Sequence, residues 1–303
     1  MLAVIAKNIY KHYAGAQALK GVDLELDWGE LHGIIGPDGA GKTTLFRILT
    51  TLILSDRGTA SIAGLDVVND YSRIREIIGY MPGRFSLYLD LTVIENLTFF
   101  ATLFNSSVQE NYHLIEDIYS QIEPFKDRRA GALSGGMRQK LALCCALIHK
   151  PSVLFLDEPT TGVDPVSRKE FWKMLTRLKE QGITILVSTP YMDEAGLCDR
   201  ISLMKEGAFM VTNTPANIIS RFEGSLWAVR SDNRFTLPGH LRGFTGVESC
   251  FAFADTYHVT SSNNRLDVEE LEKYLINKGH VNVTIYPIKP GIEDCFMRLA
   301  ANV

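Results

Sequence analysis

The spacing of apolar residues changes from strand-like to helix-like within the first fifty residues. Residues 2–6 and 18–26 are predicted strands, the second with apolar side chains at alternate positions, as in a strand with one buried face. Residues 31–35 form a continuous apolar run, followed by a glycine cluster and by apolar residues at helical spacing over 43–52. A strand, a glycine-rich loop and a helix in that order predict an α/β fold.

Helical and strand-like patterns continue to alternate up to about residue 190. Apolar residues recur every three or four positions over 92–125 and 137–149, which predicts helices. Residues 152–156 and 183–187 are short, continuous apolar runs of the kind found in parallel strands that are buried on both faces. A helix is predicted between them over 165–181, so these segments extend the α/β pattern.

The pattern changes near residues 213–215. Segments with the character of antiparallel strands follow at 225–230, 247–253, 256–261 and 281–287. One helix is predicted among them over 267–278, with Asp267 as its N-cap. Strands with a single helix among them predict a small α+β domain of about 80 residues.

The composition limits the functional classes. The chain has 303 residues, with 31 basic and 35 acidic side chains and a formal net charge of −4, a balance that disfavours a nucleic-acid-binding protein. The best candidates for a membrane span, 141–148 and 183–187, are far shorter than the roughly 20 residues required. The first ten residues hold no signal-peptide pattern, so we expect neither a span nor secretion. The five cysteines form no C-x-x-C pair, and reduced core thiols are expected.

Gly36 to Thr43 match the pattern G-x-x-x-x-G-K-T between a predicted strand and a predicted helix. Glycines let successive backbone N–H groups turn toward one anion, and the helix N-terminus adds positive potential. The loop is therefore expected to bind a nucleotide, with Lys42 at the β- and γ-phosphates and the Thr43 hydroxyl on Mg²⁺. The alternative is a glycine-rich turn with a solvated lysine. The residues expected to contact the nucleotide here are Gly36, Asp38, Gly39, Ala40, Gly41, Lys42, Thr43 and Thr44.

A second motif ends the apolar segment 153–156 with two acids, Asp157 and Glu158. An acid at the tip of a buried strand is costly unless a cation faces it. Mg²⁺ on a nucleotide supplies that cation, so Asp157 is the expected metal-side carboxylate. Glu158 would then lie beside the γ-phosphate and polarise the attacking water as the catalytic residue. An ordinary Asp-Glu turn is the alternative.

Between these motifs, residues 133–139 read Leu-Ser-Gly-Gly-Met-Arg-Gln, which resembles the signature of ATP-binding cassette (ABC) proteins. Ser134 and the two glycines precede a predicted helix, so they offer a hydroxyl, backbone donors and a helix N-terminus to an anion. The resemblance implies that Ser134, Gly135 and Gly136 do not touch the ATP of their own chain. They would contact the ATP held by the phosphate loop of a second, head-to-tail cassette.

Further matches to the family cover residues 1 to about 220. Tyr13 resembles the aromatic residue that stacks on adenine, with a core or surface tyrosine as the alternative. Residues 161–164 resemble the loop between two cassettes, and residues 78–82 resemble the strand that leads to the contact with a membrane subunit. The spacing is most similar to the ATP-binding subunits of bacterial exporters with separate membrane subunits, which often carry a C-terminal extension.

This resemblance implies a P-loop ABC ATPase core, made of a mixed sheet and a helical subdomain, followed by a small C-terminal α+β domain. We expect the nucleotide-binding domain over residues 1–222, its helical subdomain at roughly 85–150, and the extension over 223–303. ATP and Mg²⁺ are the implied cofactors, and the implied activity is ATP hydrolysis coupled to transport.

Two positions depart from the family pattern. Gly83 stands where the family has a glutamine that contacts Mg²⁺ and the attacking water, and Pro190 stands where it has a histidine that bonds the γ-phosphate. Neither residue can supply the missing group, and proline also lacks a backbone N–H. Arg84 and the hydroxyl of Thr189 are nearby alternatives, and a subfamily that works through other contacts is another.

These departures resemble the degenerate first cassette of tandem exporter ATPases. The chain is expected to bind Mg·ATP and hydrolyse it slowly, while its signature completes the site of a partner cassette. A heterodimer of cassettes is therefore favoured over a homodimer, together with an integral membrane permease subunit and without nucleic acid. The expected location is peripheral, on the cytoplasmic face of the inner (plasma) membrane. A non-catalytic ATP-sensing or regulatory cassette and a soluble, non-transport ABC ATPase are the alternatives.

Overall fold

The computed structural model describes residues 2–84, 86–261 and 266–301. They form two compact units, Met1–Thr214 and Pro215–Val303, and each is described by itself. The division precedes the boundary expected at 222/223, because helices α7 (Pro215–Ser220) and α10 (Ile292–Ala301) pack together in the second unit. Residue 85, at which the helical subdomain was expected to begin, lies outside the described residues.

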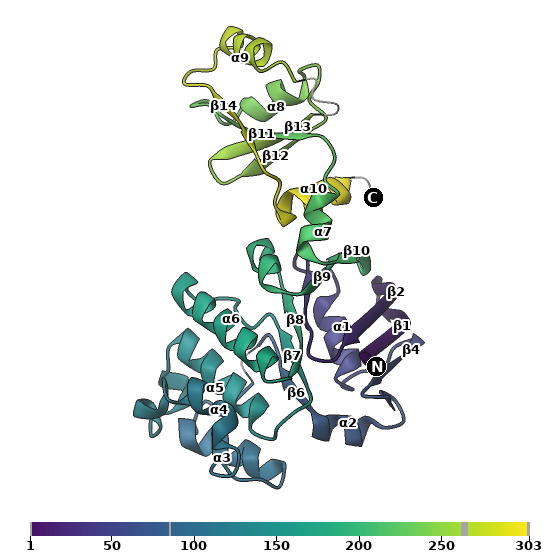
Figure 1. Ribbon diagram of the computed structural model, residues 1–303, viewed down its shortest axis with the longest axis vertical. Coiled ribbons are helices and arrows are strands. Elements are labelled where there is room, and N and C mark those ends of the chain that lie inside the picture. Colours follow the sequence, from purple (N-terminus) through teal and green to yellow (C-terminus); the bar gives the residue numbers. More distant parts are fainter. Residues whose placement is uncertain (1, 85, 262–265, 302–303) are drawn as a thin grey trace. The chain divides into compact units, whose positions relative to one another are not determined.

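A six-stranded mixed sheet forms the centre of the first unit, in the order β10-β9-β3-β8-β7-β6 (Figure 1). Strands β9 to β6 run parallel, and β10 is antiparallel to β9. Because the strands are parallel, the carboxyl ends of β3, β7 and β8 meet at one edge, where ligands bind in open α/β sheets. The bounds are β3 (Leu31–Ile35), β6 (Ile78–Met81), β7 (Val153–Asp157), β8 (Thr184–Thr189), β9 (Arg200–Lys205) and β10 (Ala208–Asn213).

A second, antiparallel sheet in the order β2-β1-β4-β5 shares its core with the central sheet. Helix α1 joins them, since its buried Leu45 and Phe46 belong to one apolar cluster with side chains of both sheets. Phe46 meets Phe155 of β7 edge to face, with ring centres 6.1 Å apart. The bounds are β1 (Leu2–Tyr13), β2 (Ala16–Asp27), β4 (Arg57–Ile62), β5 (Leu65–Asp66), α1 (Lys42–Leu49) and α2 (Tyr71–Ile77).

Helices occupy the segment between β6 and β7, as the sequence predicts. Helix α5 packs against α3 and α4, and Figure 1 shows the three helices grouped together. Helix α6 then connects β7 to β8, and the short 3₁₀ helix η3 connects β8 to β9. The bounds are α3 (Val93–Leu103), α4 (Tyr112–Tyr119), η1 (Glu123–Phe125), η2 (Ala130–Ala132), α5 (Gly135–Leu147), α6 (Pro165–Glu180) and η3 (Met192–Leu197).

The second unit is a four-stranded antiparallel sheet in the order β12-β13-β11-β14. Helices α8 and α9 contribute to its own core, in which Leu241, Leu271 and Leu275 pack with Val229 and Val259 of the sheet. Asp267 caps α9 by accepting a hydrogen bond from the backbone N–H of Glu270, which confirms the predicted cap. The bounds are β11 (Ser225–Arg230), α8 (Leu237–Arg242), β12 (Ser249–Phe253), β13 (Thr256–Ser261), α9 (Val268–Asn277) and β14 (Thr284–Ile288).

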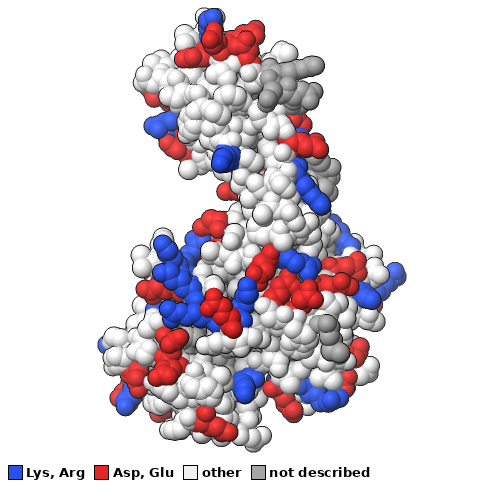
Figure 2. Space-filling model, in the orientation of Figure 1, with Lys and Arg blue, Asp and Glu red and all other residues white. Residues whose placement is uncertain are grey.

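Charged side chains of both signs are interspersed over the face shown in Figure 2. Within the part of the chain that the structure describes, no helix is long and apolar enough to cross a membrane. The five cysteines are free and buried, and burial raises the pKa of the Cys144 thiol well above its usual range. The prediction that Cys144 and Cys145 are small core residues is therefore confirmed.

Candidate functional site

The phosphate-loop motif connects β3 to α1 and follows a path that depends on its glycines. Gly41 has a φ of +109°, a left-handed value that residues with a Cβ rarely adopt. A Cβ on Gly36 would lie 2.1 Å from the carbonyl oxygen of Met204, so only glycine allows this close approach of the backbone. The glycine spacing of the motif is therefore a geometric requirement of the loop.

Lys42 connects the phosphate loop to the acidic motif formed by Asp157 and Glu158. Its side chain is buried, and Nζ donates hydrogen bonds to the carbonyl oxygens of Gly36 at 2.7 Å and Pro37 at 3.0 Å. The same nitrogen lies 3.0 Å from a carboxylate oxygen of Glu158. Two motifs that are far apart in the sequence therefore meet at one ammonium group.

Lys42 and Glu158 both line an open pocket of about 190 Å³. Its lining comes from the ends of β1 and β7, the start of β2 and the phosphate loop with the first turn of α1. Of the nucleotide contacts expected from sequence, Gly36, Asp38 and Ser134–Gly136 are not among the described lining residues. The lining residues are Tyr13, Ala18, Gly39, Ala40, Gly41, Lys42, Thr43, Thr44 and Glu158.

Asp157 ends β7 with its side chain in the interior. It is 2% exposed, and burial raises the pKa of its carboxyl group, an effect that hydrogen bonds from Ser188 and Thr43 partly oppose. The Ser188 hydroxyl donates to Asp157 Oδ1 at 2.7 Å. Mg²⁺ binds carboxylate and hydroxyl oxygens and keeps several water or phosphate ligands. A buried carboxylate beside a hydroxyl therefore fits a magnesium ion that also contacts nucleotide phosphates.

Glu158 has a strained backbone, with φ at +51°. Its N–H donates to both oxygens of Ser188, at 3.0 Å to the hydroxyl and 3.1 Å to the carbonyl. Left-handed φ values of non-glycine residues persist where the surrounding structure fixes them, often at functional sites. These bonds hold the Glu158 side chain toward Lys42 and the pocket.

The two positions that depart from the family pattern lie beside this site. A Cβ on Gly83 would lie 3.0 Å from the carbonyl oxygen of Asp157, so position 83 directly adjoins the acidic pair. Pro190 follows Thr189, whose hydroxyl donates to Glu194 and accepts a hydrogen bond from the N–H of Tyr191. The single hydroxyl hydrogen of Thr189 is therefore bonded to Glu194. The interpretation that this hydroxyl replaces the histidine expected at position 190 is wrong.

The signature residues begin helix α5 at the surface. The Ser134 hydroxyl caps the helix by accepting a hydrogen bond from the N–H of Met137, while Ser134 and Gly135 are exposed. A Cβ on Gly136 would lie 2.9 Å from Oγ of Ser167 in α6. The signature therefore presents a helix N-terminus outward and packs against the start of α6.

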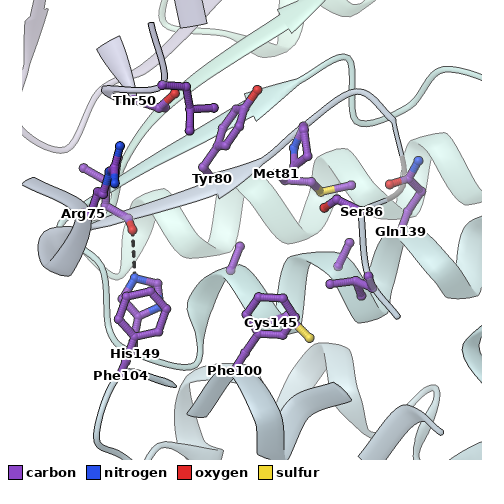
Figure 3. A pocket seen from close by; sticks show the side chains of 16 residues that line it. Thr50, Arg75, Tyr80, Met81, Ser86, Phe100, Phe104, Gln139, Cys145 and His149 are labelled. Atoms are coloured by element: carbon purple, nitrogen blue, oxygen red, sulfur yellow. Dashed lines mark hydrogen bonds between the residues drawn. The ribbon is translucent and has the colours of Figure 1, made fainter. Parts of the chain in front are cut away.

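A separate apolar pocket of about 250 Å³ is lined by β6 and helices α3 and α5 (Figure 3). Phe100 and Phe104 lie across it from Tyr80 and Met81. His149 stacks on Phe104 with ring centres 3.8 Å apart and donates from Nε2 to the carbonyl oxygen of Ile78 at 2.8 Å. The sequence indicated a membrane-subunit contact after residues 78–82, but it did not identify the aromatic wall from α3.

Sequence reasoning also missed two buried polar residues, Ser188 and Glu194. Ser188 orients both acids of the site, and Glu194 holds Thr189. The only available signal for Ser188 was a polar residue at the end of an apolar run. Glu194 lies in a segment whose helix is too short to produce a periodic pattern.

Comparisons with known proteins agree with this geometry. The sequence profile of the ABC transporter family matches residues 19–161. Over 236 residues, 76% of this chain, it is 41% identical to the probable multidrug ABC transporter ATP-binding protein YbhF of Escherichia coli (strain K12) and spans about 40% of that protein. Over 302 residues it is 38% identical to Nod factor export ATP-binding protein I of Burkholderia lata, covering 97% of this chain and 95% of that one.

A solved structure, cbiO1 from Clostridium perfringens, described as part of the ABC transporter complex cbiONQ, superposes with a TM-score of 0.65 at 28% identity, covering 73% of this chain and 91% of that one. The predicted α/β core with extra C-terminal strands and helices is thereby confirmed. Both the sequence matches and the superposition lead to the same assignment: the chain belongs to the ABC transporter family, in which it is an ATP-binding cassette.

Proposed function

We propose that the chain binds Mg·ATP in the pocket formed by the phosphate loop, Tyr13 and Glu158. The observation that carries this proposal is the contact of Lys42 with Glu158 in the lining of one pocket, directly after the buried Asp157 at the end of β7. Tyr13 is 46% exposed at the rim, with Lys11 Nζ 5.9 Å from its ring centre, and its ring would stack on adenine. Thr43 and Asp157 would hold Mg²⁺, which offsets phosphate charge when bound.

ATP binding would change the partners of Lys42 and Glu158. A triphosphate carries more negative charge than a carboxylate and offers several acceptor oxygens, so it would displace Glu158 from Lys42. The released carboxylate remains in the pocket because the bonds to Ser188 fix its backbone. It would then accept a proton from the water that attacks the γ-phosphate.

Hydrolysis at this site is proposed to be slow. Gly83 has no side chain, the Thr189 hydroxyl donates to Glu194, Pro190 has no N–H, and the N–H of Tyr191 is bonded to Thr189. Positions 83 and 190 therefore lack the side-chain donors that the family pattern places beside the γ-phosphate. Losing one such donor costs about 10² to 10³ in rate.

The exposed signature is proposed to complete the ATP site of a second cassette. Ser134 and Gly135 lie outside the pocket of their own chain and present the N-terminus of α5 outward. A helix N-terminus favours an anion such as a γ-phosphate. A slow site in this chain favours a different partner cassette that has the glutamine and the histidine, so we propose a heterodimer.

The proposed cellular role is the ATP-binding subunit of an exporter, peripheral on the cytoplasmic face of the inner membrane. The aromatic pocket beside β6 would receive a helix of a membrane permease subunit, because an apolar groove of this kind accepts the apolar face of an amphipathic helix. The printed names of two relatives, a multidrug transporter protein and a Nod factor export protein, favour export. Their cargoes differ, so the substrate would be selected by the membrane subunit.

The test is to measure Mg·ATP binding and hydrolysis by the purified chain. We expect binding that Lys42→Ala abolishes and that Lys20→Ala, a change at an exposed lysine, leaves intact. Turnover should be slow, and Glu158→Gln should lower it further because it removes the carboxylate that accepts the proton. Brisk turnover that Glu158→Gln abolishes would contradict the slow site, and absence of ATP binding would contradict the whole proposal.

The transport role has its own test, co-purification from detergent-solubilised membranes. We expect the chain to be recovered with a membrane protein and with a second cassette. Recovery only from the soluble fraction, with ribosomes, would instead support a non-transport ABC ATPase.

A further inference from the structure

A buried carboxylate outside the nucleotide pocket, Glu194 of η3, connects the loop that follows β7 with the end of β8. Glu194 is 2% exposed, and its oxygens accept hydrogen bonds from the Thr160 hydroxyl at 2.9 and 3.2 Å and from the Thr189 hydroxyl. Nε of Arg168 donates to it at 3.1 Å. The guanidinium of Arg168 also covers the ring of Tyr191, 3.9 Å from its centre. The loop after β7, the end of β8 and α6 therefore share one acceptor on η3.

The two loops face different functional groups. Thr160 lies in the loop that follows β7 and ends at Asp164, the cap of α6. In this loop, the carbonyl oxygen of Gly162 lies 3.7 Å from the position that a Cβ on Gly135 of the signature would take. Thr189 precedes Pro190 at the edge of the sheet where the phosphate loop and Asp157 lie. Glu194, in η3 of the connection after β8, accepts hydrogen bonds from Thr160 of the first loop and from Thr189 at the end of β8.

The hydrogen bonds around Glu194 fix the relative positions of these elements more narrowly than apolar packing would. A buried carboxylate is costly unless donors satisfy it, and Glu194 has two hydroxyls and a guanidinium around it. Each of these donors holds one loop or helix at hydrogen-bond distance, so a displacement of one loop breaks a charge-assisted bond unless the other follows.

We propose that Glu194 is a positioning residue that makes the two loops respond to ATP as one unit. Binding at Lys42 and Glu158 would move the loop that begins after Glu158, and the bond from Thr160 to Glu194 would pass that movement to residues 190–196, where Pro190 offers no donor to the phosphate. The same carboxylate thereby links the nucleotide pocket to the surface that carries the signature. This inference rests on the proposed ATP binding, and its test separates the two.

The test is hydrogen exchange of the purified full chain, with and without Mg·ATP. In the wild type we expect ATP to slow exchange in the phosphate loop and, by about tenfold, in residues 190–196. Glu194→Gln and Thr160→Val should keep the protection of the phosphate loop and the Kd for ATP but lose the protection at 190–196. Thr160→Ser keeps the hydroxyl and should restore the wild-type response.

Asp193→Asn is the matched control, because Asp193 bonds the same arginine from an exposed position. It should respond to ATP like the wild type. If Glu194→Gln and Thr160→Val still protect residues 190–196, or if the wild type protects only its phosphate loop, the inference is overturned. A wild type with no ATP protection anywhere would instead contradict the proposed function. If Glu194→Gln speeds exchange throughout the first unit without ATP, the comparison of Thr160→Val with Thr160→Ser tests the inference in its place.

Discussion

At the scale of single residues, the acids that end β7 are neighbours in sequence but occupy different environments. Asp157 is buried with the Ser188 hydroxyl as a partner, whereas the side chain of Glu158 is 21% exposed and faces Lys42. Burial with a hydroxyl neighbour suits an inner ligand of a cation, while a partly solvated carboxylate with a displaceable partner suits proton transfer. The left-handed φ of Glu158, +51°, produces this division, because it ends the strand directly after Asp157.

The raised pKa of Asp157 predicts a stability effect with a defined sign. Just above the ordinary value of 3.8, the folded protein binds more protons at this carboxyl than the unfolded chain, so the free energy of unfolding falls as pH rises through that window. Asp157→Asn should therefore raise the Tm at pH 7 without nucleotide, and the difference should shrink toward pH 4. Mg·ATP should raise the Tm of the wild type but not that of Asp157→Asn.

Differential scanning fluorimetry across pH measures both effects. Asp193→Asn is the control, because its side chain is 76% exposed. A lower Tm for Asp157→Asn throughout this pH range would contradict the assigned cost of burying the charge.

The missing side chains at positions 83 and 190 predict a gain of activity. Gly83→Gln with Pro190→His would restore an amide beside the acidic pair and an imidazole after β8, so kcat should rise by about tenfold or more. A Cβ at position 83 requires a small shift from the Asp157 carbonyl, 3.0 Å away. The double variant is therefore compared in steady-state hydrolysis with each single change.

Arg84→Gln serves as the matched control, since it adds the same amide one residue later. An unchanged kcat in a double variant that still binds ATP would show that other contacts set the rate.

At the scale of elements, the helices next to the site begin at capping side chains. Asp164 accepts hydrogen bonds from the N–H groups of Val166 and Ser167 at the start of α6, and Ser134 caps α5. Cap residues, apolar period and the following glycine are local signals, which is why the predicted helix 165–181 agrees closely with α6. Strands β9 and β10 were not predicted, and neither was helix α8, whose six residues cover fewer than two helical turns.

The N-terminus of α5 gives a prediction that separates folding from function. Ser134→Ala should lower the free energy of unfolding by about 1 kcal/mol through loss of the cap. Ser134→Asp keeps a cap acceptor and should preserve the Tm, but its negative charge would repel the γ-phosphate of the partner site.

ATP hydrolysis by the complex purified from native membranes, measured beside the Tm of each variant, tests this prediction. We expect the Ser134→Asp complex to lose most of its activity. A Ser134→Asp complex as active as the wild type would contradict the assignment of the signature to a partner's site.

At the scale of the whole molecule, each unit has its own sheet and its own core. The first unit contains both the nucleotide pocket and the aromatic pocket beside β6, each formed within residues of that unit. In the second unit, His240 and His280 meet at 2.8 Å and the Ser231 hydroxyl bonds the same His280. The sequence had left these histidines as unrelated positions, because forty residues separate them and neither lies in a motif.

The aromatic pocket predicts that membrane attachment depends on one face of α3. Phe100 lines the pocket, whereas Leu103 on the same helix is 60% exposed and does not. Phe100→Arg should abolish co-purification with the membrane subunit and leave ATP binding unchanged, since a charge in an apolar groove is costly.

Quantitative recovery from solubilised membranes, with Leu103→Arg as the matched control, measures this effect. Equal recovery of the two variants would show that the membrane subunit docks elsewhere.

The α/β class, the nucleotide motifs and the capped helices follow from the order of residues along the chain, because they depend on local spacing and on glycines that the backbone path requires. Which side chains share a site follows from the folding of distant segments against one another. The tertiary structure pairs Glu158 with Lys42, and it places hydrogen bonds from Ser188 to Asp157 and from Thr189 to Glu194. The physical reason is that burial and hydrogen-bond partners are set by how distant strands align, which no local period encodes.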